Sequence, residues 1–325
     1  MNYALLTLHR TVVFDSGSSS VLLPSSVCNS DPGCTNLKHK FDSSKSTTFS
    51  TDNETFFSEF GTGTGVQASD YENVTGIVVR DTLSVAGLSA SDYQFGLITQ
   101  QTAGFSNDPF DGIVGMAFPA ALSVGNSTFL EALYNNGEID SAIYGLYLAP
   151  ETVGGAEITL GDIDECKLAG DINYVPVNST FGEFQISFDE VYVSGEQASV
   201  PAQYAIMDSG TSNLVAPDAV SAEAIYSLIS SDITAVDSLG TYAIPCSKLD
   251  SLDAPIVFSI GGKNYTVPGK ELSVGPLADQ PDMCQTLITA GGGWWILGAS
   301  LLKYYYSVWD VGNVKFGLAE TAFSP

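Results

Sequence analysis

The stretch VVFDSGSS, residues 12–19, has a counterpart in the second half of the chain, AIMDSGTS, residues 205–212. Each copy is an apolar run that ends in Asp-Ser-Gly and is followed by two hydroxyl residues. The run predicts a buried strand, and the glycine predicts a tight turn. Asp15 and Asp208 therefore stand where a strand leaves the core, which is a costly place for a lone carboxylate. We expect a chain with two such sites to bring the two carboxyl groups together.

The internal repeat extends beyond these two motifs. The first motif is followed later in its half by IVG at 113–115, and the second by ILG at 296–298. Two copies of one β unit that face each other would place the two aspartates at a pseudo-twofold axis. A single Asp-Ser-Gly is also a common surface turn. Two matched copies, each followed by two apolar residues and a glycine, argue against that simpler interpretation.

Length and composition predict two all-β domains. The chain has 325 residues, of which 44% are hydrophobic and 15% charged, so it is globular and too long for one ordinary core. Short apolar runs separated by Gly, Asn, Asp and Ser favour strands with long loops. We place the domain boundary between residues 1–177, which carry Asp15, and residues 178–325, which carry Asp208. Short helices are expected at 127–136 and 218–230.

The charge balance excludes several kinds of partner. The formal net charge is −26, from 37 acidic and 11 basic residues. Nucleic acid and anionic membrane surfaces need clustered basic residues, so neither is expected as a partner. Many carboxylates take up protons in acid, which lowers their mutual repulsion and suits an acidic compartment. We expect no membrane span and a leader and propeptide that lie outside this chain.

Cysteines and glycosylation signals indicate the secretory route. We pair Cys28 with Cys34 and Cys246 with Cys284, although spacing alone cannot fix connectivity. Cys166 is then left as a free thiol, which we expect to be buried or partly buried. No cysteine spacing typical of a metal site is present. Five Asn-x-Ser/Thr signals occur, at Asn53, Asn73, Asn126, Asn178 and Asn264.

A pair of neighbouring aspartates suggests a specific chemistry. Two carboxyl groups within about 3 Å of each other share one proton and titrate as a unit. The ionised member can take a proton from water while the protonated member polarises a peptide carbonyl. This hydrolysis needs no metal, cofactor, histidine or nucleophilic serine, and no HExxH or GxSxG pattern is present.

The residues next to the aspartates fit this chemistry. The hydroxyl three positions after each aspartate can hydrogen-bond its outer oxygen. The serine directly after each aspartate can bond the opposite loop, and the glycine lets the loops approach closely. These supporting residues are Ser16, Gly17, Ser18, Ser209, Gly210 and Thr211.

Five stretches resemble the pepsin-like family of aspartic peptidases, over essentially the whole chain. They are FDSGSSSVLLPSS at 14–26, FDGIVGMAFP at 110–119, FQISFDEVYVSGE at 184–196, MDSGTSNLVAP at 207–217 and WILGASLLKYYYSVWD at 295–310. The resemblance implies a bilobal all-β fold with a few short helices and Asp15 and Asp208 as the catalytic pair. It also implies polypeptide substrates, statine-type inhibitors, a monomer and a secreted or vacuolar location. Both proposed disulfides resemble family pairs.

The resemblance is weakest in the flap, a hairpin that closes over the substrate in this family, and at the shortened N-terminus. Phe60-Gly61-Thr62 stands where the family has Tyr-Gly-Thr, so we expect these residues to contact substrate. Leu22 replaces the tryptophan that hydrogen-bonds that tyrosine. An alternative alignment brings Tyr71 into the flap. We expect a less well fixed flap and slower catalysis.

The other aromatic residues and the two histidines are assigned to the core, to a pocket or to the surface. Phe105, Phe110 and Phe118 either line a pocket beside the aspartates or fill the core, and Phe105 is the first choice for substrate contact. The three tryptophans and the tyrosines at 304–306 are expected in the core, and both histidines at the surface.

The preferred function is an aspartic endopeptidase active in acid. One rival is a weak or inactive relative that serves as a binding protein. A second rival is a secreted β-sandwich lectin, which would not explain the repeated Asp-Ser-Gly motif.

Overall fold

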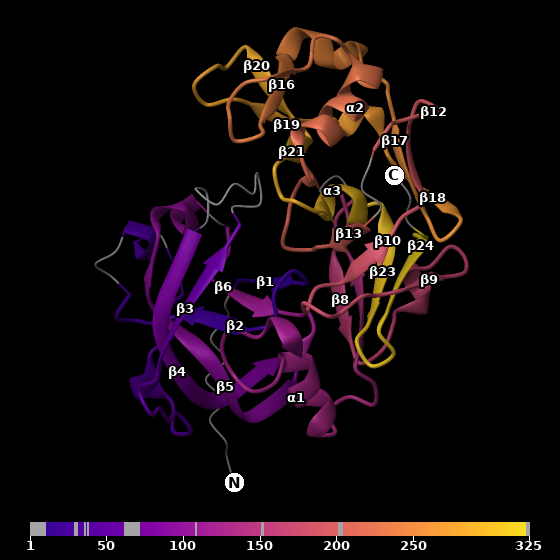
Figure 1. Ribbon diagram of the computed structural model, residues 1–325. Helices are drawn as coiled ribbons and strands as arrows, with labels where there is room; N and C mark the ends of the chain where they lie inside the picture. Colours follow the sequence, from indigo (N-terminus) through magenta and orange to yellow (C-terminus); the bar gives the residue numbers. More distant parts are fainter. Residues whose placement is uncertain are drawn as a thin grey trace. The chain divides into compact units, whose positions relative to one another are not determined.

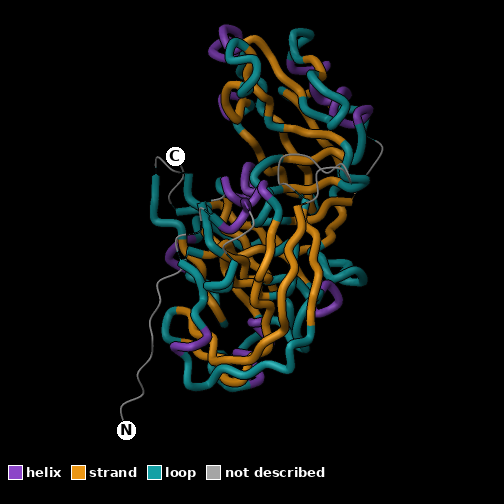
Figure 2. The backbone as a smooth tube through the Cα atoms, turned by 90° about the vertical axis from the view of Figure 1, so that its left-hand side faces the viewer, coloured by secondary structure: helices purple, strands orange, loops and turns teal. Residues whose placement is uncertain are grey.

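Figure 1 shows the computed structural model of the chain, which is built mainly of strands (Figure 2). The structure describes residues 11–28, 32–35, 37, 39–61, 72–107, 109–150, 153–200 and 204–322. These residues form two compact units. The first contains the described residues up to 142 and the short segment 179–183, and the second contains 143–178 and 184–322.

The first unit is organised around a six-stranded sheet with the spatial order β1-β6-β2-β5-β4-β3. Its strands are β1 (Val12–Asp15), β2 (Val21–Pro24), β3 (Thr55–Phe60), β4 (Glu72–Val85), β5 (Leu88–Gln101) and β6 (Gly112–Gly115). Ala86 and Gly87 join β4 to β5, and both have positive φ, as the tight two-residue hairpin turn requires. Alternate side chains of β3 are buried because successive residues of a strand face opposite sides.

The second unit contains four smaller sheets with the orders β10-β13-β22-β14-β21, β12-β11-β17-β18, β15-β16-β20-β19 and β8-β7-β23-β24-β9. Its first nine strands are β7 (Ile143–Tyr147), β8 (Glu157–Leu160), β9 (Asn173–Pro176), β10 (Gln185–Ser187), β11 (Glu190–Val193), β12 (Glu196–Gln197), β13 (Tyr204–Met207), β14 (Leu214–Ala216) and β15 (Thr234–Ala235). The others are β16 (Tyr242–Pro245), β17 (Ile256–Ile260), β18 (Lys263–Val267), β19 (Ser273–Pro276), β20 (Met283–Thr286), β21 (Ile288–Ala290), β22 (Trp295–Leu297), β23 (Tyr305–Asp310) and β24 (Lys315–Glu320).

Aromatic side chains fill the interior of the second unit. Trp309 is fully buried, stacks on Tyr144 at 5.6 Å and meets Phe184 edge-on at 4.8 Å. Trp295, also fully buried, packs edge-on against Phe188. Such offset and edge-to-face pairs add to the stability gained from burying apolar area. These aromatic contacts therefore stabilise the sheets of the second unit, including the one whose strand β13 precedes Asp208.

The same strand pattern occurs in both units. In the first, β1 is parallel to β6, β6 is antiparallel to β2, and β2 is parallel to β5. In the second, β13 is parallel to β22, β22 is antiparallel to β14, and β14 is parallel to β21. The repeat inferred from sequence motifs is thus a repeat of sheet topology, and the all-β fold class is confirmed.

Three short α-helices complete the described structure: α1 (Phe129–Asn135), α2 (Ala219–Ile229) and α3 (Ala299–Leu302). α1 begins with a capping box between Thr128 and Glu131, and the Asp218 side chain caps α2. Both helices were predicted, α1 from its capping residues and helical spacing and α2 as a helical stretch at 218–230. α3 was not predicted, because Gly298 at its N-cap offers no side chain as a signal. Among the described residues, no helix is long and apolar enough to cross a membrane.

Both proposed disulfides, Cys28–Cys34 and Cys246–Cys284, are present. The expectation for Cys166 was wrong, because this free thiol is exposed. It lies in a surface 3-10 helix, Glu165–Lys167, whose first turn is capped by the Asp164 side chain.

Two further expectations differ from the structure. Trp294 is not in the core, because 47% of its surface is exposed. It immediately precedes β22, whose first residue, Trp295, points inward, and neighbouring side chains at a strand end face opposite sides. The division of the chain also falls earlier than residue 177, since 143–178 pack with the second unit, where β7 pairs with β23.

Candidate active site

Asp15 lies at the last position of β1, and its carboxyl group is held by its own turn. The backbone N–H of Gly17 donates to Oδ1 of Asp15 at 2.9 Å. The Ser18 hydroxyl donates to the other oxygen, Oδ2. Asp15 is buried, with 8% of its surface exposed. One amide and one hydroxyl thus compensate for the burial of this side chain.

Asp208 follows β13 directly and is held in the same way. The Gly210 N–H donates to Oδ1 at 2.8 Å, and the Thr211 hydroxyl donates to Oδ2 at 2.6 Å. Asp208 is half-buried. The two units therefore present one carboxyl group each, with matching donors on matching oxygens.

A glycine at the end of the neighbouring strand fits closely against each turn: Gly115 is the last residue of β6, and Gly298 directly follows β22. A Cβ at Gly115 would lie 2.4 Å from the backbone carbon of Ser19, and one at Gly298 would lie 2.2 Å from the carbonyl oxygen of Thr211. Real Cβ atoms do not approach other atoms so closely. The glycine that ends each apolar-apolar-Gly element is therefore needed for the turn to pack on its sheet.

Backbone hydrogen bonds tie each turn to the residues after that glycine. Met116 N–H donates to the Asp15 carbonyl at 2.7 Å, and Ala299 N–H donates to the Thr211 carbonyl at 2.7 Å. The glycine-ending elements are evident in the sequence, whereas these supporting amides are not. Backbone groups leave no residue-type signal in a sequence, so only the repeat itself could have indicated them.

The serines directly after the aspartates differ in exposure. Ser16 is fully buried, whereas Ser209 is half-buried. Their proposed bonds to the opposite loop stay a prediction.

The described part of the predicted flap ends at Phe60 and Gly61. Phe60, the last residue of β3, meets Phe105 edge-on at 6.1 Å. Leu22 is fully buried in the same hydrophobic cluster. Gly61 is exposed, while Thr62 and Tyr71 lie outside the described residues. Phe60 thus packs as an aromatic anchor at the base of the predicted flap.

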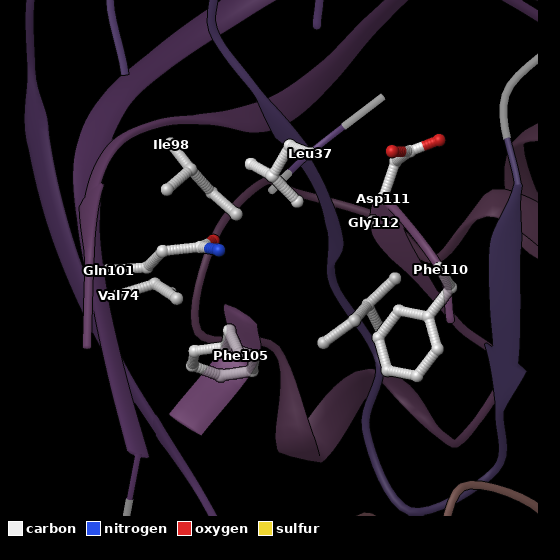
Figure 3. A pocket seen from close by; sticks show the side chains of 9 residues that line it. Leu37, Val74, Ile98, Gln101, Phe105, Phe110, Asp111 and Gly112 are labelled. Carbon is white, nitrogen blue, oxygen red and sulfur yellow. The ribbon is translucent and has the colours of Figure 1, made fainter. Parts of the chain in front are cut away.

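A shallow apolar recess, partly open to solvent, lies within the first unit (Figure 3). Phe105 comes from the 3-10 helix Ala103–Asn107, Phe110 from the segment before β6, and Ile98 from β5. Two residues after the lining residue Ile113, β6 reaches Gly115, which pairs with Asp15. The full lining is Leu37, Val74, Ile98, Gln101, Phe105, Phe110, Asp111, Gly112 and Ile113.

The three phenylalanines differ in their surroundings, and the place of any of them beside the aspartates stays a prediction. Phe105 and Phe110 line the recess, whereas Phe118 does not and is buried in the core with 5% of its surface exposed. Sequence reasoning missed Leu37 and Gln101, because they become neighbours of the phenylalanines only through the sheet and the loop that Cys28 and Cys34 close.

The recess also contains a carboxylate whose hydrogen-bond partners come from distant parts of the chain. Asp111 accepts hydrogen bonds from the backbone N–H of His39 at 3.2 Å and of Thr11 at 3.3 Å. Nδ1 of His39 lies 2.9 Å from its Oδ2. His39 is exposed, as expected, although its pairing with Asp111 was not foreseen; His9 lies outside the described residues.

The sequence predicts a site that needs no metal, and only the described residues can be searched for possible metal ligands. Among these residues, no group of three or more His, Cys, Asp or Glu side chains is placed to hold a metal ion. The absence of a metal requirement remains an expectation from the chemistry of the two carboxyl groups.

Comparison with known proteins agrees with the class that this fold and these turns indicate, the pepsin-like aspartic peptidases. The family model described as eukaryotic aspartyl protease matches residues 8–321, so the chain belongs to this family. Over 316 residues it is 34% identical to pepsin A of Bos taurus, covering 96% of this chain and 80% of that protein.

Two further relatives give the same result. Pepsin A of Sus scrofa is 33% identical over 321 residues, covering 96% of this chain and 78% of the relative. An aspartic protease of Phaffia rhodozyma is 30% identical over 317 residues, covering 96% of this chain and 73% of the relative. The resemblance drawn from five sequence stretches is therefore confirmed.

Proposed function

We propose that the protein is an aspartic endopeptidase in which Asp15 and Asp208 form the catalytic pair. The observation that carries this proposal is the matched support of the two carboxyl groups. Each ends or follows the same strand of a repeated sheet, and each accepts from one backbone amide and one hydroxyl. A surface turn would not need this support twice in equivalent places.

The proposed mechanism follows from the chemistry of two neighbouring carboxyl groups. At about 3 Å they share one proton, and the pepsins are the standard example of such a pair. The ionised carboxylate takes a proton from a bound water, which attacks the peptide carbonyl carbon. The protonated carboxyl group donates its proton to the carbonyl oxygen, which gives a tetrahedral diol. Transfer of a proton to the leaving nitrogen then lets the C–N bond break.

The substrate is an extended polypeptide, and the recess of the first unit receives one of its apolar side chains. Phe105 in the wall of the recess and Phe60 behind it support this assignment. Phe60 and Gly61 contact the substrate from the flap in this proposal, and Thr62, the third predicted contact, lies outside the described residues. The protein acts as a monomer, without a cofactor, and binds statine-type inhibitors between its carboxyl groups.

A secreted or vacuolar location is part of the proposal. Pepsin-like proteases are secreted or vacuolar, and two disulfides fit an oxidising compartment. Four of the five glycosylation signals have an exposed asparagine, which leaves room for a glycan; they are Asn53, Asn126, Asn178 and Asn264.

A catalytically weak relative that binds peptides is the second candidate. Phe60 and Leu22 favour it, because neither can make the hydrogen bond that positions the family's flap. The matched hydrogen bonds to Asp15 and Asp208 favour turnover. The lectin has no remaining support, since the chain belongs to the aspartyl protease family.

Single substitutions of the two aspartates test the proposal. Asp15→Asn and Asp208→Asn should each lower kcat on an unfolded protein substrate by about 10³-fold or more, because one carboxyl group can no longer exchange its proton. Activity is measured between pH 2.5 and 7, with and without a statine-type inhibitor, and circular dichroism checks the fold. Asp250→Asn, at an exposed position, is the matched control and should keep full activity.

The outcomes separate the candidates. Acid activity that the inhibitor abolishes supports the endopeptidase. Inhibitor binding without turnover supports the binding protein. Full activity of either Asn variant at the paired positions rejects the catalytic pair.

A further inference from the structure

The outermost strand of the six-stranded sheet, β3, carries an exposed phenylalanine. Among the described strands, β3 pairs with β4 alone and forms one edge of the sheet (Figure 1). Phe57 lies in the middle of β3, and 56% of its surface is exposed. An exposed aromatic ring on an edge strand is a point at which another chain can attach, so proteins commonly cover or charge such edges.

The residues around Phe57 define an open face of the sheet. Three directly opposed pairs of β3 and β4 form this face: Thr55 with Ile77, Phe57 with Thr75, and Glu59 with Asn73. All six residues are exposed or half-buried, whereas the four residues that lie between them along the two strands are buried. Phe57 and Asn73 are therefore diagonal neighbours on the open face, a relation in which residues lie about 7–8 Å apart.

Asn73 begins an Asn-Val-Thr glycosylation signal, and its side chain is available for modification. The backbone N–H of Asn73 donates to the Thr102 hydroxyl at 2.9 Å, and its carbonyl accepts from the Thr102 N–H at 3.0 Å. The side-chain amide of Asn73 makes no hydrogen bond within the described part of the chain. The backbone is thus held in the sheet, while the amide that would carry a glycan lies on the open face.

The chemistry of this face suits the first sugar of an N-linked glycan. N-acetylglucosamine has a ring face of C–H groups, hydroxyl groups around its edge and an acetamide N–H. Polarised C–H groups pack favourably on the negative face of an aromatic ring, which Phe57 offers. Glu59, directly opposite Asn73, is exposed and can accept hydrogen bonds from the sugar's hydroxyl or N–H groups.

Two comparisons favour a glycan as the occupant of this face. A second copy of the chain would bring another net charge of −26 against the first, which opposes pairing of two β3 edges. Asn264 also starts a glycosylation signal in an outer strand, β18, but its opposed residue is Ser259 and the diagonal residue is Val257. The aromatic ring beside the glycosylation signal therefore distinguishes Asn73 from Asn264.

We propose that Asn73 carries an N-linked glycan whose first N-acetylglucosamine packs on Phe57 and shields the β3 edge of the first unit. The inference goes beyond the proposed peptidase function and does not depend on it. Neither Asn73 nor Phe57 takes part in the reaction at Asp15 and Asp208.

Occupancy is tested on the full chain secreted from a yeast host. Peptide N-glycosidase digestion in heavy-oxygen water converts each glycosylated asparagine to a labelled aspartate, which peptide mass spectrometry locates. Label at Asn73 is the expected result. Secreted protein in which Asn73 remains an unlabelled asparagine overturns the proposal.

The contact with Phe57 is tested by a cycle of two substitutions. Asn73→Gln removes the glycan and should lower Tm by about 1–4 °C, as expected for the loss of one exposed cross-strand contact. In a Phe57→Thr background the same substitution should leave Tm unchanged, because the ring is already absent. Any effect of glutamine itself appears in both backgrounds and cancels in the comparison. Equal shifts in the two backgrounds overturn the proposal.

Asn264→Gln is the matched control, and its effect on Tm should be the same with Phe57 or Thr at position 57. Trimming with endoglycosidase H leaves only the first sugar, so the trimmed protein should keep the Tm difference between the unmodified and Asn73→Gln chains. A dependence of the Asn264→Gln effect on Phe57 as large as that of Asn73→Gln, or loss of the difference after trimming, contradicts a contact between the first sugar and the ring.

Discussion

Each of the two aspartates is supported by donors from its own turn. Gly17 and Ser18 hold Asp15, and Gly210 and Thr211 hold Asp208. These contacts involve residues two and three positions along the chain, so a short motif specifies them almost completely. The sequence alone therefore predicted the two hydroxyl donors, whereas the amide donors of Gly17 and Gly210 appear only in the structure. Gln101 and Asp111 lie in the recess through long-range contacts, and no local pattern identified them.

A third acidic residue, Glu183, should make stability depend on pH. It is half-buried, and burial raises the pKa of its carboxyl group above the ordinary value. The folded state then binds the proton more tightly than the unfolded state. The penalty is fully present above the raised pKa, shrinks as the pH falls through it, and disappears below the unfolded pKa.

Glu183→Gln should therefore raise the free energy of unfolding at pH 7 and leave it unchanged at pH 3. Denaturant unfolding at both pH values measures the effect. Glu196→Gln, at an exposed position, is the control and should be neutral at both. A Glu183→Gln protein that is less stable than the unmodified one at pH 7 would contradict this assignment.

At the scale of elements, two four-strand sets with the same pairing pattern carry the candidate site. In each set a glycine that ends or directly follows one strand packs against the segment after the neighbouring Asp motif. The sequence predicted this repeat because an apolar run, a turn and a glycine are all local signals. The pairing of β7 with β23 was not predicted, because no local pattern links residues so far apart in the sequence. Residues 143–178 therefore pack with the second unit, although the predicted boundary placed most of them in the first.

A single methyl group at Gly298 tests the packing of the second turn. Gly298→Ala would place its Cβ 2.2 Å from the Thr211 carbonyl oxygen, so the turn must move. We expect a loss of about 2–4 kcal/mol in the free energy of unfolding, as for other overpacked sites. Catalytic activity should fall more than the remaining folded fraction explains, because Thr211 also holds Asp208.

Gly170→Ala is the matched control in the same unit. Nothing lies within 4 Å of a Cβ at Gly170, and its backbone has no positive φ. This variant should unfold like the unmodified protein within about 0.5 kcal/mol. Equal stability of the Gly298→Ala and Gly170→Ala proteins in denaturant unfolding would show that the turn does not need the glycine.

At the scale of the whole molecule, the acidic composition and the internal repeat both fit the proposed aspartic peptidase. The chain carries 37 acidic and 11 basic residues, which gives a formal net charge of −26. Protonation of carboxylates in acid makes this charge less negative and so reduces self-repulsion. Each unit supplies one carboxyl group, and the proposed mechanism requires both. Local motifs specify each unit, whereas the meeting of the two carboxyl groups depends on the complete chain.

A crystal structure of the protein with a statine-type inhibitor measures this meeting directly. The account predicts that the nearest carboxyl oxygens of Asp15 and Asp208 lie about 3 Å apart, with the statine hydroxyl in contact with both side chains. Two carboxyl groups more than about 8 Å apart, too far to share a proton or to hold one water between them, would contradict it.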